Sequence, residues 1–560
     1  MHIERPTAHT SNVSELFGGK VFKVPDYQRA YAWGEKNIEE FWNDIKDGLE
    51  TDTPHYWGTI TLRNTGQTLY DENSASSFTI YEVVDGQQRL TTLYLILFAF
   101  YKLGKSAIKS NFLKCNDFYR LELGTLNQQF LKELIDDTDH SPELSSISSN
   151  KLIKKTYEYF ENQIKTYENI DRLVRYTQSL TFSLEFEIKD EGLAIKAFES
   201  LNDRGKPLTL LDKSKSFLIF YSARFLGGSL NQVINNIFGN VFKNIDIIKD
   251  IAFEAKIEYI KNPRYRFSED ELFRFFYHYF AKYSIDKYVL NSLNYDYTIT
   301  TENVFDQWLK KSCIALKNLN GQSDRLSEFI SDMLNNFNKF VDNFKKLIED
   351  SKSDSSVRKL FCFLGMNAAV YPLIISLKSE NIIDKEFLEL IETSDLRVYK
   401  VRGTDPRSEL YKEAISNVKV NPHKELILSK VYKFAENFMK NAEFQLYLSG
   451  NMYGNPATKY ILWEYQKICD PSFNEWDYDL FKNVQVEHIF PKEPTISFPG
   501  SGFEDEADYL KYLNILGNLT LLEEDINKSI GNTAPINKAK PYQGSKIPVT
   551  KKLGDRKSVV

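Results

Sequence analysis

The chain has 560 residues, of which 42% are apolar and 14% aromatic, so it exceeds the size of one hydrophobic core and predicts two to four domains. The net charge of −6 argues against a protein that coats nucleic acid through bulk positive charge. Four scattered cysteines without a Cys-x-x-Cys pair indicate the reducing cytoplasm and no zinc ribbon, and no segment has the pattern of a signal peptide or the length of a membrane span.

The first motif is a junction between a strand and a helix. Residues 80–84 predict a strand, and apolar residues at helical spacing from Leu90 to Tyr101 predict a helix directly after it. The junction, Asp85-Gly86-Gln87-Gln88-Arg89, would then present backbone N–H groups and the positive helix end to a ligand. Gly86 permits close approach of the backbone, Arg89 offers a planar fork to a phosphate, and Asp85 suits a metal or a ribose hydroxyl. The chain has no Walker lysine motif, so this is phosphate-site chemistry of another kind.

Two further segments accompany this junction. One is an aromatic and basic cluster at 24–33 that contains Tyr27, Gln28 and Arg29, and the other is a loop bounded by Gly and Pro that contains Asn202 and Arg204 after a helix predicted at 192–201. Residues 55–62 predict another strand. The cluster at 27–29 is suited either to a nucleotide or to DNA, and the sequence does not separate these roles.

Between about 210 and 440 the pattern predicts mostly helix. Ser268 and Glu271 form a capping-box pattern at the start of a helix that is apolar on most faces, so His278 on that helix is predicted to be a core residue. A break in the helical pattern at 396–410 carries Arg397, Arg402 and Arg407, which either line a DNA channel or form a solvated loop.

The most informative segment is Val-Glu-His-Ile-Phe-Pro at 486–491, followed by Gly-Asn-Leu-Thr-Leu-Leu at 517–522 and by Asn527. A carboxylate and a second oxygen ligand hold a hard cation such as Mg²⁺ or Mn²⁺, and a neutral imidazole takes a proton from water. Glu487, His488, Asn518 and Asn527 supply these groups in order. The pattern predicts a nuclease centre with one metal ion, of the His-Asn-Asn type.

A basic tail follows this motif. From Lys528 to the end there are eight Lys or Arg residues against one acid, Asp555. Such a tail either binds DNA phosphates or is simply solvated.

The C-terminal motif, together with Lys538 and Tyr542, resembles the ββα-metal (HNH) nuclease domain of GmrSD-type, type IV restriction proteins. The resemblance implies that His488 is the general base, that Glu487 is a metal ligand, that Asn518 supports His488 or the metal loop, and that Asn527 completes the metal site. The first pair in the family is often Asp-His, whereas this chain has Glu-His.

The three N-terminal motifs, which span about 12–225, resemble the GmrS-type domain related to the ParB/sulfiredoxin fold, which binds or hydrolyses nucleoside triphosphates. The resemblance includes the SspE-like proteins that sense phosphorothioate DNA. It implies a site for a triphosphate (GTP, UTP or ATP) formed by a set of loop residues. The set is Asp85, Gly86, Gln87, Gln88, Arg89, Asn202 and Arg204.

We therefore expect an α+β chain of three parts: a GmrS-like domain at 1–225, a helical middle at 226–430, and a nuclease domain with a basic tail at 431–560. The predicted function is a nucleotide-regulated, modification-dependent DNA endonuclease in antiviral defence. Its predicted target is phosphorothioate DNA or DNA with glucosylated hydroxymethylcytosine, and a homodimer is plausible because one such centre cuts one strand at a time. The alternatives are an NTP-hydrolysing sensor of modified DNA that cuts weakly or not at all, and a nuclease directed at RNA.

Overall fold

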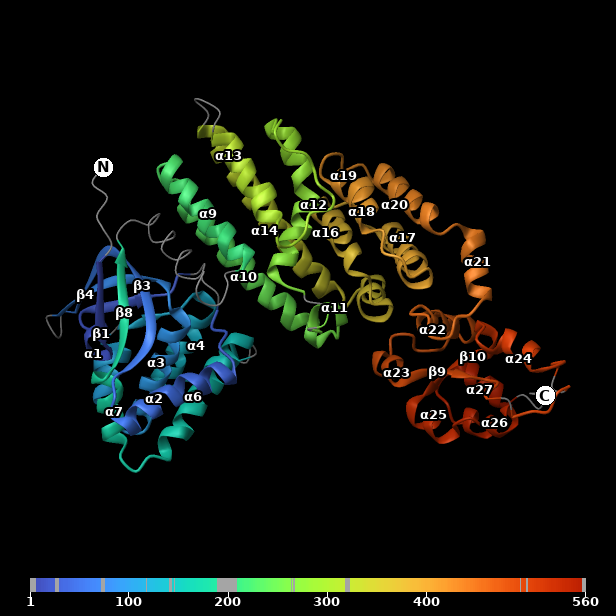
Figure 1. Ribbon diagram of the computed structural model, residues 1–560, viewed down its shortest axis with the longest axis horizontal. Helices are drawn as coiled ribbons and strands as arrows, with labels where there is room; N and C mark the ends of the chain where they lie inside the picture. Colours follow the sequence, from blue (N-terminus) through green and yellow to red (C-terminus); the bar gives the residue numbers. More distant parts are fainter. Residues whose placement is uncertain are drawn as a thin grey trace.

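The computed structural model describes residues 7–25, 30–71, 76–116, 118–139, 144–145, 147–188, 209–262, 264, 267–317, 323–493, 495–499 and 502–555. Tyr27, Gln28 and Arg29, the helix predicted at 192–201, and the loop with Asn202 and Arg204 lie outside these residues. The described parts follow one another along the long axis of the molecule (Figure 1). An α/β domain lies at one end, a helical region in the middle and a small domain with two strands at the other end. The α+β layout predicted from the sequence is confirmed.

The N-terminal domain is built on a mixed sheet of six strands in the order β1-β8-β3-β4-β2-β7. Strand β8 runs antiparallel to β1 and parallel to β3, and β3 runs antiparallel to β4, with a register shift next to Thr61. The strands are β1 Thr7–Asn12, β2 Lys20–Lys23, β3 His55–Asp71, β4 Ser76–Asp85, β7 Leu121–Glu122 and β8 Thr181–Ile188, with β5 Lys114–Cys115 and β6 Phe118–Tyr119 as a separate pair. The strands predicted at 55–62 and 80–84 are confirmed.

Helices pack beside this sheet around α3 (Gln87–Lys102), the helix predicted after the first motif. Residues Leu90 to Phe100 of α3 are all buried, because α3 is apolar on every face and packs against both the sheet and α6. The neighbouring α2 is amphipathic and buries Ile38, Trp42 and Ile45 at helical spacing. The other helices are α1 Val13–Leu16, α2 Glu35–Thr51, η1 Lys109–Leu113, α4 Thr125–Asp136, α6 Ser148–Lys165 and α7 Ile170–Ser179.

The middle region is helical, as predicted. Ser268 caps α12 by accepting a hydrogen bond from the backbone of Glu271, and His278 on that helix is fully buried, which confirms its predicted core position. The longer helices are α9 Leu210–Phe225, α10 Asn231–Glu254, α12 Glu269–Tyr288, α13 Lys311–Lys317, α14 Ser323–Asp350, α16 Tyr371–Ser379, α17 Lys385–Ser394, α20 Lys424–Phe438 and α21 Asn441–Ser449. The shorter ones are α11 Glu258–Lys261, η3 Phe305–Lys310, α15 Ser355–Arg358, η4 Lys359–Leu364, η5 Ala368–Val370, η6 Asp395–Val401, α18 Arg407–Leu410, η7 Tyr411–Ile415 and α19 Ser416–Val418.

The C-terminal region contains a pair of antiparallel strands surrounded by helices (Figure 1). The elements are α22 Thr458–Cys469, α23 Tyr478–Asn483, β9 Val484–His488, α24 Glu506–Leu513, η8 Leu516–Asn518, β10 Leu519–Glu523, α25 Glu524–Ile530, α26 Pro535–Gln543 and α27 Pro548–Asp555. The segment predicted to be a basic tail thus contains two helices. Helix α27 packs on α22, α26 and β10, and Thr550 in it is fully buried and bonded to Thr520. This part is folded because apolar and hydroxyl side chains such as Ile547 and Thr550 are buried, while Lys540, Lys551 and Lys552 are exposed. Lys538 is the exception, because it is buried.

The described residues form two large cores and a small cluster of Leu522, Ile530 and Tyr542. One lies within the N-terminal domain, between Val13 and Tyr176. The other is continuous from Leu211 in α9 to Ile547, so it joins the helical middle to the strands of the C-terminal region. Helix α9, which the predicted boundary at 225 assigns to the N-terminal domain, therefore packs with the middle region, and the boundary predicted at 430 crosses a shared core.

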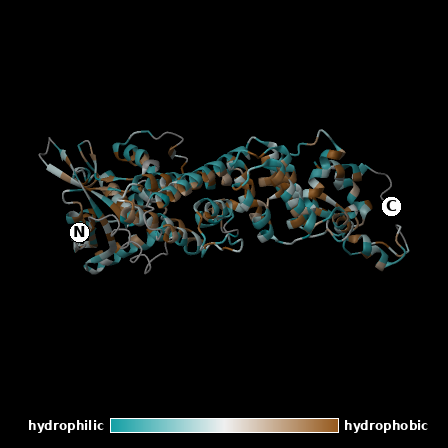
Figure 2. Ribbon diagram, turned by 90° about the horizontal axis from the view of Figure 1, so that it is seen from above, coloured by the Kyte–Doolittle hydropathy of each residue, from teal (hydrophilic) through white to brown (hydrophobic). Residues whose placement is uncertain are grey.

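Apolar and hydrophilic residues alternate around the helices when the molecule is seen from above (Figure 2). Among the helices in the described ranges, none combines the length and the apolar content that crossing a bilayer requires.

Candidate functional site

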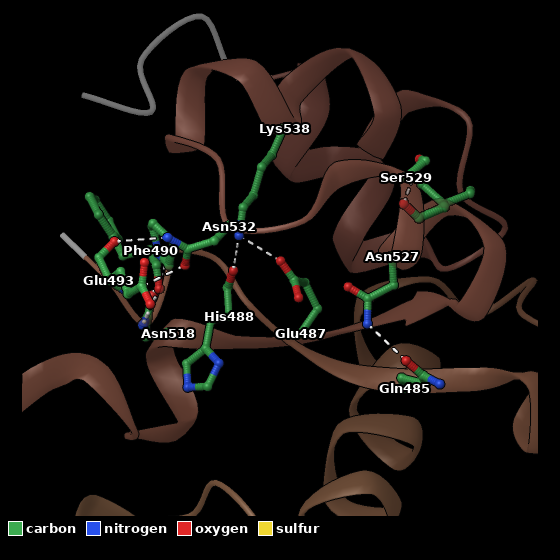
Figure 3. Close-up of polar contacts among 12 residues, drawn as sticks. Gln485, Glu487, His488, Phe490, Glu493, Asn518, Asn527, Ser529, Asn532 and Lys538 are labelled. Atoms are coloured by element: carbon green, nitrogen blue, oxygen red, sulfur yellow. Dashed lines mark hydrogen bonds and ion pairs between the residues drawn. The ribbon is translucent and has the colours of Figure 1, made fainter. Parts of the chain in front are cut away.

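The motif at 486–491 lies on the strand pair of the C-terminal region. In the register of β9 and β10, Leu519 is opposite His488 and Thr520 is opposite Glu487, and α25 begins directly after β10. This ββα unit brings Glu487, His488 and Asn527 together although Asn527 lies 39 positions after His488. Because neighbouring side chains alternate along a strand, the Glu487 carboxylate and the His488 imidazole extend to opposite sides of β9 (Figure 3).

Glu487 and Asn527 form the oxygen-rich side of this unit. Lys538 of α26 donates hydrogen bonds to Oε1 of Glu487 and to the backbone oxygen of His488, both at 2.5 Å, and only 1% of the Lys538 side chain is exposed. Asn527 donates through Nδ2 to Oε1 of Gln485 at 3.0 Å, which turns its own carbonyl oxygen toward the Glu487 carboxylate (Figure 3).

His488 is held in one orientation by two neighbours. Its Nε2 lies 3.0 Å from Oδ1 of Asn514, and its ring lies 4.2 Å from the ring of Tyr453. Since Oδ1 is an acceptor, Nε2 carries the proton and Nδ1 keeps a lone pair. Burial lowers the pKa of His488 below its usual value. The hydrogen bond with Asn514 is the largest opposing effect, and the smaller charge effects of Lys492 and Lys538 lower the pKa while that of Glu487 raises it. The imidazole is therefore neutral at pH 7, as a general base must be.

Asn518 organises the loop after β9 and has no contact with the His488 ring. Its Oδ1 accepts from the backbone N–H of Phe490 at 2.8 Å, and its Nδ2 donates to the oxygens of Phe490 and Leu513 at 3.2 and 2.7 Å. The backbone of Ile489 also donates to the Asn518 oxygen at 2.9 Å. Asn518 therefore holds the loop after β9, and the residue that is hydrogen-bonded to His488 is Asn514.

The loop between α21 and α22 closes the other side of the site. The backbone N–H groups of Met452 and Tyr453 donate to the oxygen of Asn514, at 2.8 and 3.3 Å, and Nδ2 of Asn455 donates to the oxygen of Val401 in η6 at 2.9 Å. A cavity of about 710 Å³ lies between this loop and the strands, and Glu487, His488 and Asn527 all line it.

The donor set of this site fits a hard divalent cation. Glu487 offers a carboxylate and Asn527 an amide oxygen that face one another, and oxygen ligands completed by water are what Mg²⁺ and Mn²⁺ prefer. In the described residues no group of three or more His, Cys, Asp or Glu side chains is placed to hold a metal.

The predicted nucleotide site lies at the end of β4. Arg89 lies 3.5 Å from Oδ2 of Asp85, and burial raises the pKa of Asp85 although Arg89 and the N–H of Gly86 oppose this effect. Gly86 has a φ of 89°, and a side chain there would meet the oxygen of Thr59 at 3.0 Å. A side chain at Gly58 would meet Nη1 of Arg89 at 2.7 Å, so Arg89 lies directly on the backbone of β3. The strand-to-helix geometry predicted for this motif is present.

Gln88 connects the two N-terminal motifs. Its Oε1 accepts from the backbone of Ala32 at 2.8 Å, and its Nε2 donates to the oxygen of Ala30 at 3.3 Å. Gln88 therefore holds the end of the segment that contains residues 27–29, whereas Gln87, at the first position of α3, is half-buried. Gln88 has a positioning role here that the motif alone does not reveal.

Two protein-family models match the chain. The model of the N-terminal domain of GmrSD restriction endonuclease covers residues 13–219, and the model of the C-terminal domain of GmrSD restriction endonucleases covers residues 435–559. The chain belongs to the GmrSD restriction endonuclease family. The family predicted from the motifs is thus confirmed, and the chain is a nuclease whose substrate is DNA. Comparison with curated proteins gives no match.

The three arginines at 396–410 have local partners in this GmrSD chain. Arg397 donates to Asn441 at 2.6 Å and lies over the ring of Phe444, Arg402 donates to the oxygen of Phe438, and Arg407 pairs with Asp405. The first two therefore connect η6 to the junction of α20 and α21, and the segment is mostly helical rather than a loop.

Sequence reasoning missed Asn514, Tyr453 and Gln485. Asn514 is the C-cap of α24, and Tyr453 lies 35 positions before His488, so no local pattern connects them to the histidine. Gln485 had a usable signal, because it lies two positions before Glu487 on a predicted strand and so shares its face.

Proposed function

We propose that this chain is a nucleotide-regulated, modification-dependent DNA endonuclease of antiviral defence that cuts with a one-metal His-Asn-Asn centre. The observation that supports it best is the pair of facing oxygen donors, Glu487 and Asn527, beside a neutral and firmly oriented His488 in one cavity.

In this proposal Glu487 and Asn527 hold Mg²⁺ or Mn²⁺, and the bound cation stabilises the negative charge on the phosphate. His488 takes a proton from water through Nδ1, and Asn514 stabilises the imidazolium by accepting a hydrogen bond from Nε2. Lys538 fixes the Glu487 carboxylate and the end of β9, and Asn518 fixes the loop that follows.

Asp85, Gly86, Gln87 and Arg89 are proposed to bind the phosphates of GTP, UTP or ATP at the start of α3, and Asn202 and Arg204 are proposed to contribute to the same site. The support is the sharp turn at Gly86, the partly buried Asp85–Arg89 pair and the amino end of a long buried helix. Tyr27, Gln28 and Arg29 are proposed to contact the nucleotide or the modified DNA; Gln88 holds Ala30 and Ala32, which follow them in the chain.

The decisive experiment is cleavage of plasmid DNA that is unmodified, phosphorothioate-containing or glucosylated, with and without Mg²⁺, Mn²⁺ and each NTP. We expect metal-dependent cutting of one substrate class, changed by one NTP and abolished by His488→Ala. NTP turnover without cutting of any DNA would instead favour the sensor, and cutting of RNA alone would favour the RNA-directed alternative. Full activity of His488→Ala would refute the site assignment.

A further inference from the structure

The cavity beside His488 and Glu487 is lined by three lysines, which differ in how their charges are neutralised. Lys538 is paired with Glu487. Lys459 and Lys492 also line the cavity, and among the described residues neither forms an ion pair with a carboxylate. Other lysines of the same region are paired, such as Lys482 with Glu258 and Lys528 with Glu524.

Lys459 is a half-buried cation without a counter-ion. It is the second residue of α22, its Nζ donates to the backbone oxygen of Lys482 at 3.3 Å, and it lies 4.9 Å from the centre of the Phe481 ring. A carbonyl oxygen and the face of an aromatic ring offset the positive charge of a half-buried ammonium group only in part. A phosphate in the cavity would supply the missing negative charge.

Lys492 is positioned through the same ring that supports His488. Its Nζ lies 4.3 Å from the centre of the Tyr453 ring, and that ring lies 4.2 Å from His488. Its side chain is exposed, so its charge is available at the mouth of the cavity. The two lysines therefore border the proposed reaction centre from two separate elements, α22 and the loop after β9.

We propose that Lys459 and Lys492 bind backbone phosphates of the DNA strand next to the phosphodiester that is cut. This inference rests on the proposed nuclease function, because it places the strand in the cavity that contains His488. The two contacts hold the strand by charge and do not read its sequence.

The test measures DNA binding against salt concentration by fluorescence anisotropy, in a His488→Ala background that leaves the DNA intact. Each lost phosphate contact lowers the slope of log affinity against log salt by about 0.9. We expect Lys459→Met and Lys492→Met each to show this loss and the double variant to lose about twice as much. The matched control is Lys433→Met, an exposed lysine of α20 that is outside both the cavity and the basic tail, and its slope should equal that of the parent.

A second arm uses Lys459→Arg, which keeps the positive charge. Burial lowers the pKa of Lys459 to about 8, and Lys482 adds to the effect. The other titratable groups around this cavity are Tyr453, Glu487, His488, Lys492 and Lys538. Since the free ammonium loses its proton as the pH rises through about 8, DNA affinity should fall between pH 7 and 9 in the parent and fall less in Lys459→Arg.

Slopes of the Lys459→Met and Lys492→Met variants equal to that of Lys433→Met would overturn the proposal, as would a change seen with duplex RNA and not with DNA. The nuclease proposal has a different refutation. A protein that binds DNA with the expected dependence on Lys459 and Lys492 but never cuts it would contradict the nuclease proposal and leave the two phosphate contacts standing. Unfolding temperatures of the variants establish that any change in slope is not a loss of fold.

Discussion

Replacing Lys538 by methionine tests whether the buried Lys538–Glu487 pair organises the site. The change removes two hydrogen bonds of 2.5 Å from an ammonium that is 1% exposed and leaves a Glu487 carboxylate that is 12% exposed. Removing one partner of a buried ion pair costs about 3–5 kcal/mol.

The expected change in melting temperature follows from the size of the core that unfolds with the site. That core runs from Leu211 to Ile547, roughly 340 residues, and an unfolding entropy of about 2.1 cal/mol/K per residue gives about 0.7 kcal/mol/K. Lys538→Met should therefore lower the melting temperature of this unit by about 4–7 °C in EDTA.

The assay is thermal unfolding followed by calorimetry, with and without millimolar Mg²⁺. Lys540→Met is the matched control, because Lys540 lies on the same helix but is exposed, and it should shift the midpoint by only about 1 °C. Mg²⁺ should stabilise Lys538→Met more than the parent, since Glu487 then lacks its cation. A midpoint of Lys538→Met equal to that of Lys540→Met would refute this account of the site.

The remaining predictions concern the other polar contacts. Asn514→Asp should move the acid limb of the cleavage pH profile upward, because a carboxylate beside His488 raises its pKa and the base must be neutral; an unchanged limb would contradict the contact. Asn518→Ala should lower the free energy of unfolding by about 1–3 kcal/mol, because it leaves buried backbone groups of the loop unpaired. Chemical denaturation measures this loss, and cleavage should fall with it. Arg89→Met should weaken NTP binding in calorimetry without affecting metal-dependent nicking, and equal affinity would remove Arg89 from the nucleotide site. Gly86→Ala should reduce NTP binding and stability together, since its φ of 89° and the Thr59 oxygen leave no room for a methyl group, and a normal melting temperature would contradict this.

The sequence correctly predicted those helices, strands and caps that depend only on residues close together in the chain. The strand before Asp85, the helix after it, the cap at Ser268 and the buried His278 all follow from short-range patterns of apolar and capping residues. The prediction that Glu487, His488 and Asn527 lie together came from the resemblance to a family. Spacing along the chain does not show which faces of a strand and a helix meet.

The missed features depend on tertiary structure. Asn514 contacts His488 because α24 ends at this residue, next to the histidine in the fold. Tyr453 contacts His488 from the loop before α22. Lys538 belongs to the recognised motif, but its burial against Glu487 depends on where α26 places it in the folded domain. The C-terminal lysines predicted a tail because charge composition does not reveal that Thr550 and Ile547 are buried.

The hydrogen bond from Asn455 to Val401 determines where this protein could be divided. A fragment that begins at β9 would keep both strands, α25 and every residue of the recognised motif. It would lose the loop whose backbone holds Asn514, and with it Tyr453, the ring that packs on His488. Anyone who grafts this cutting module onto another DNA-binding protein should therefore keep the loop before α22 and the helical middle, which shares one core with the strands, as part of the catalyst.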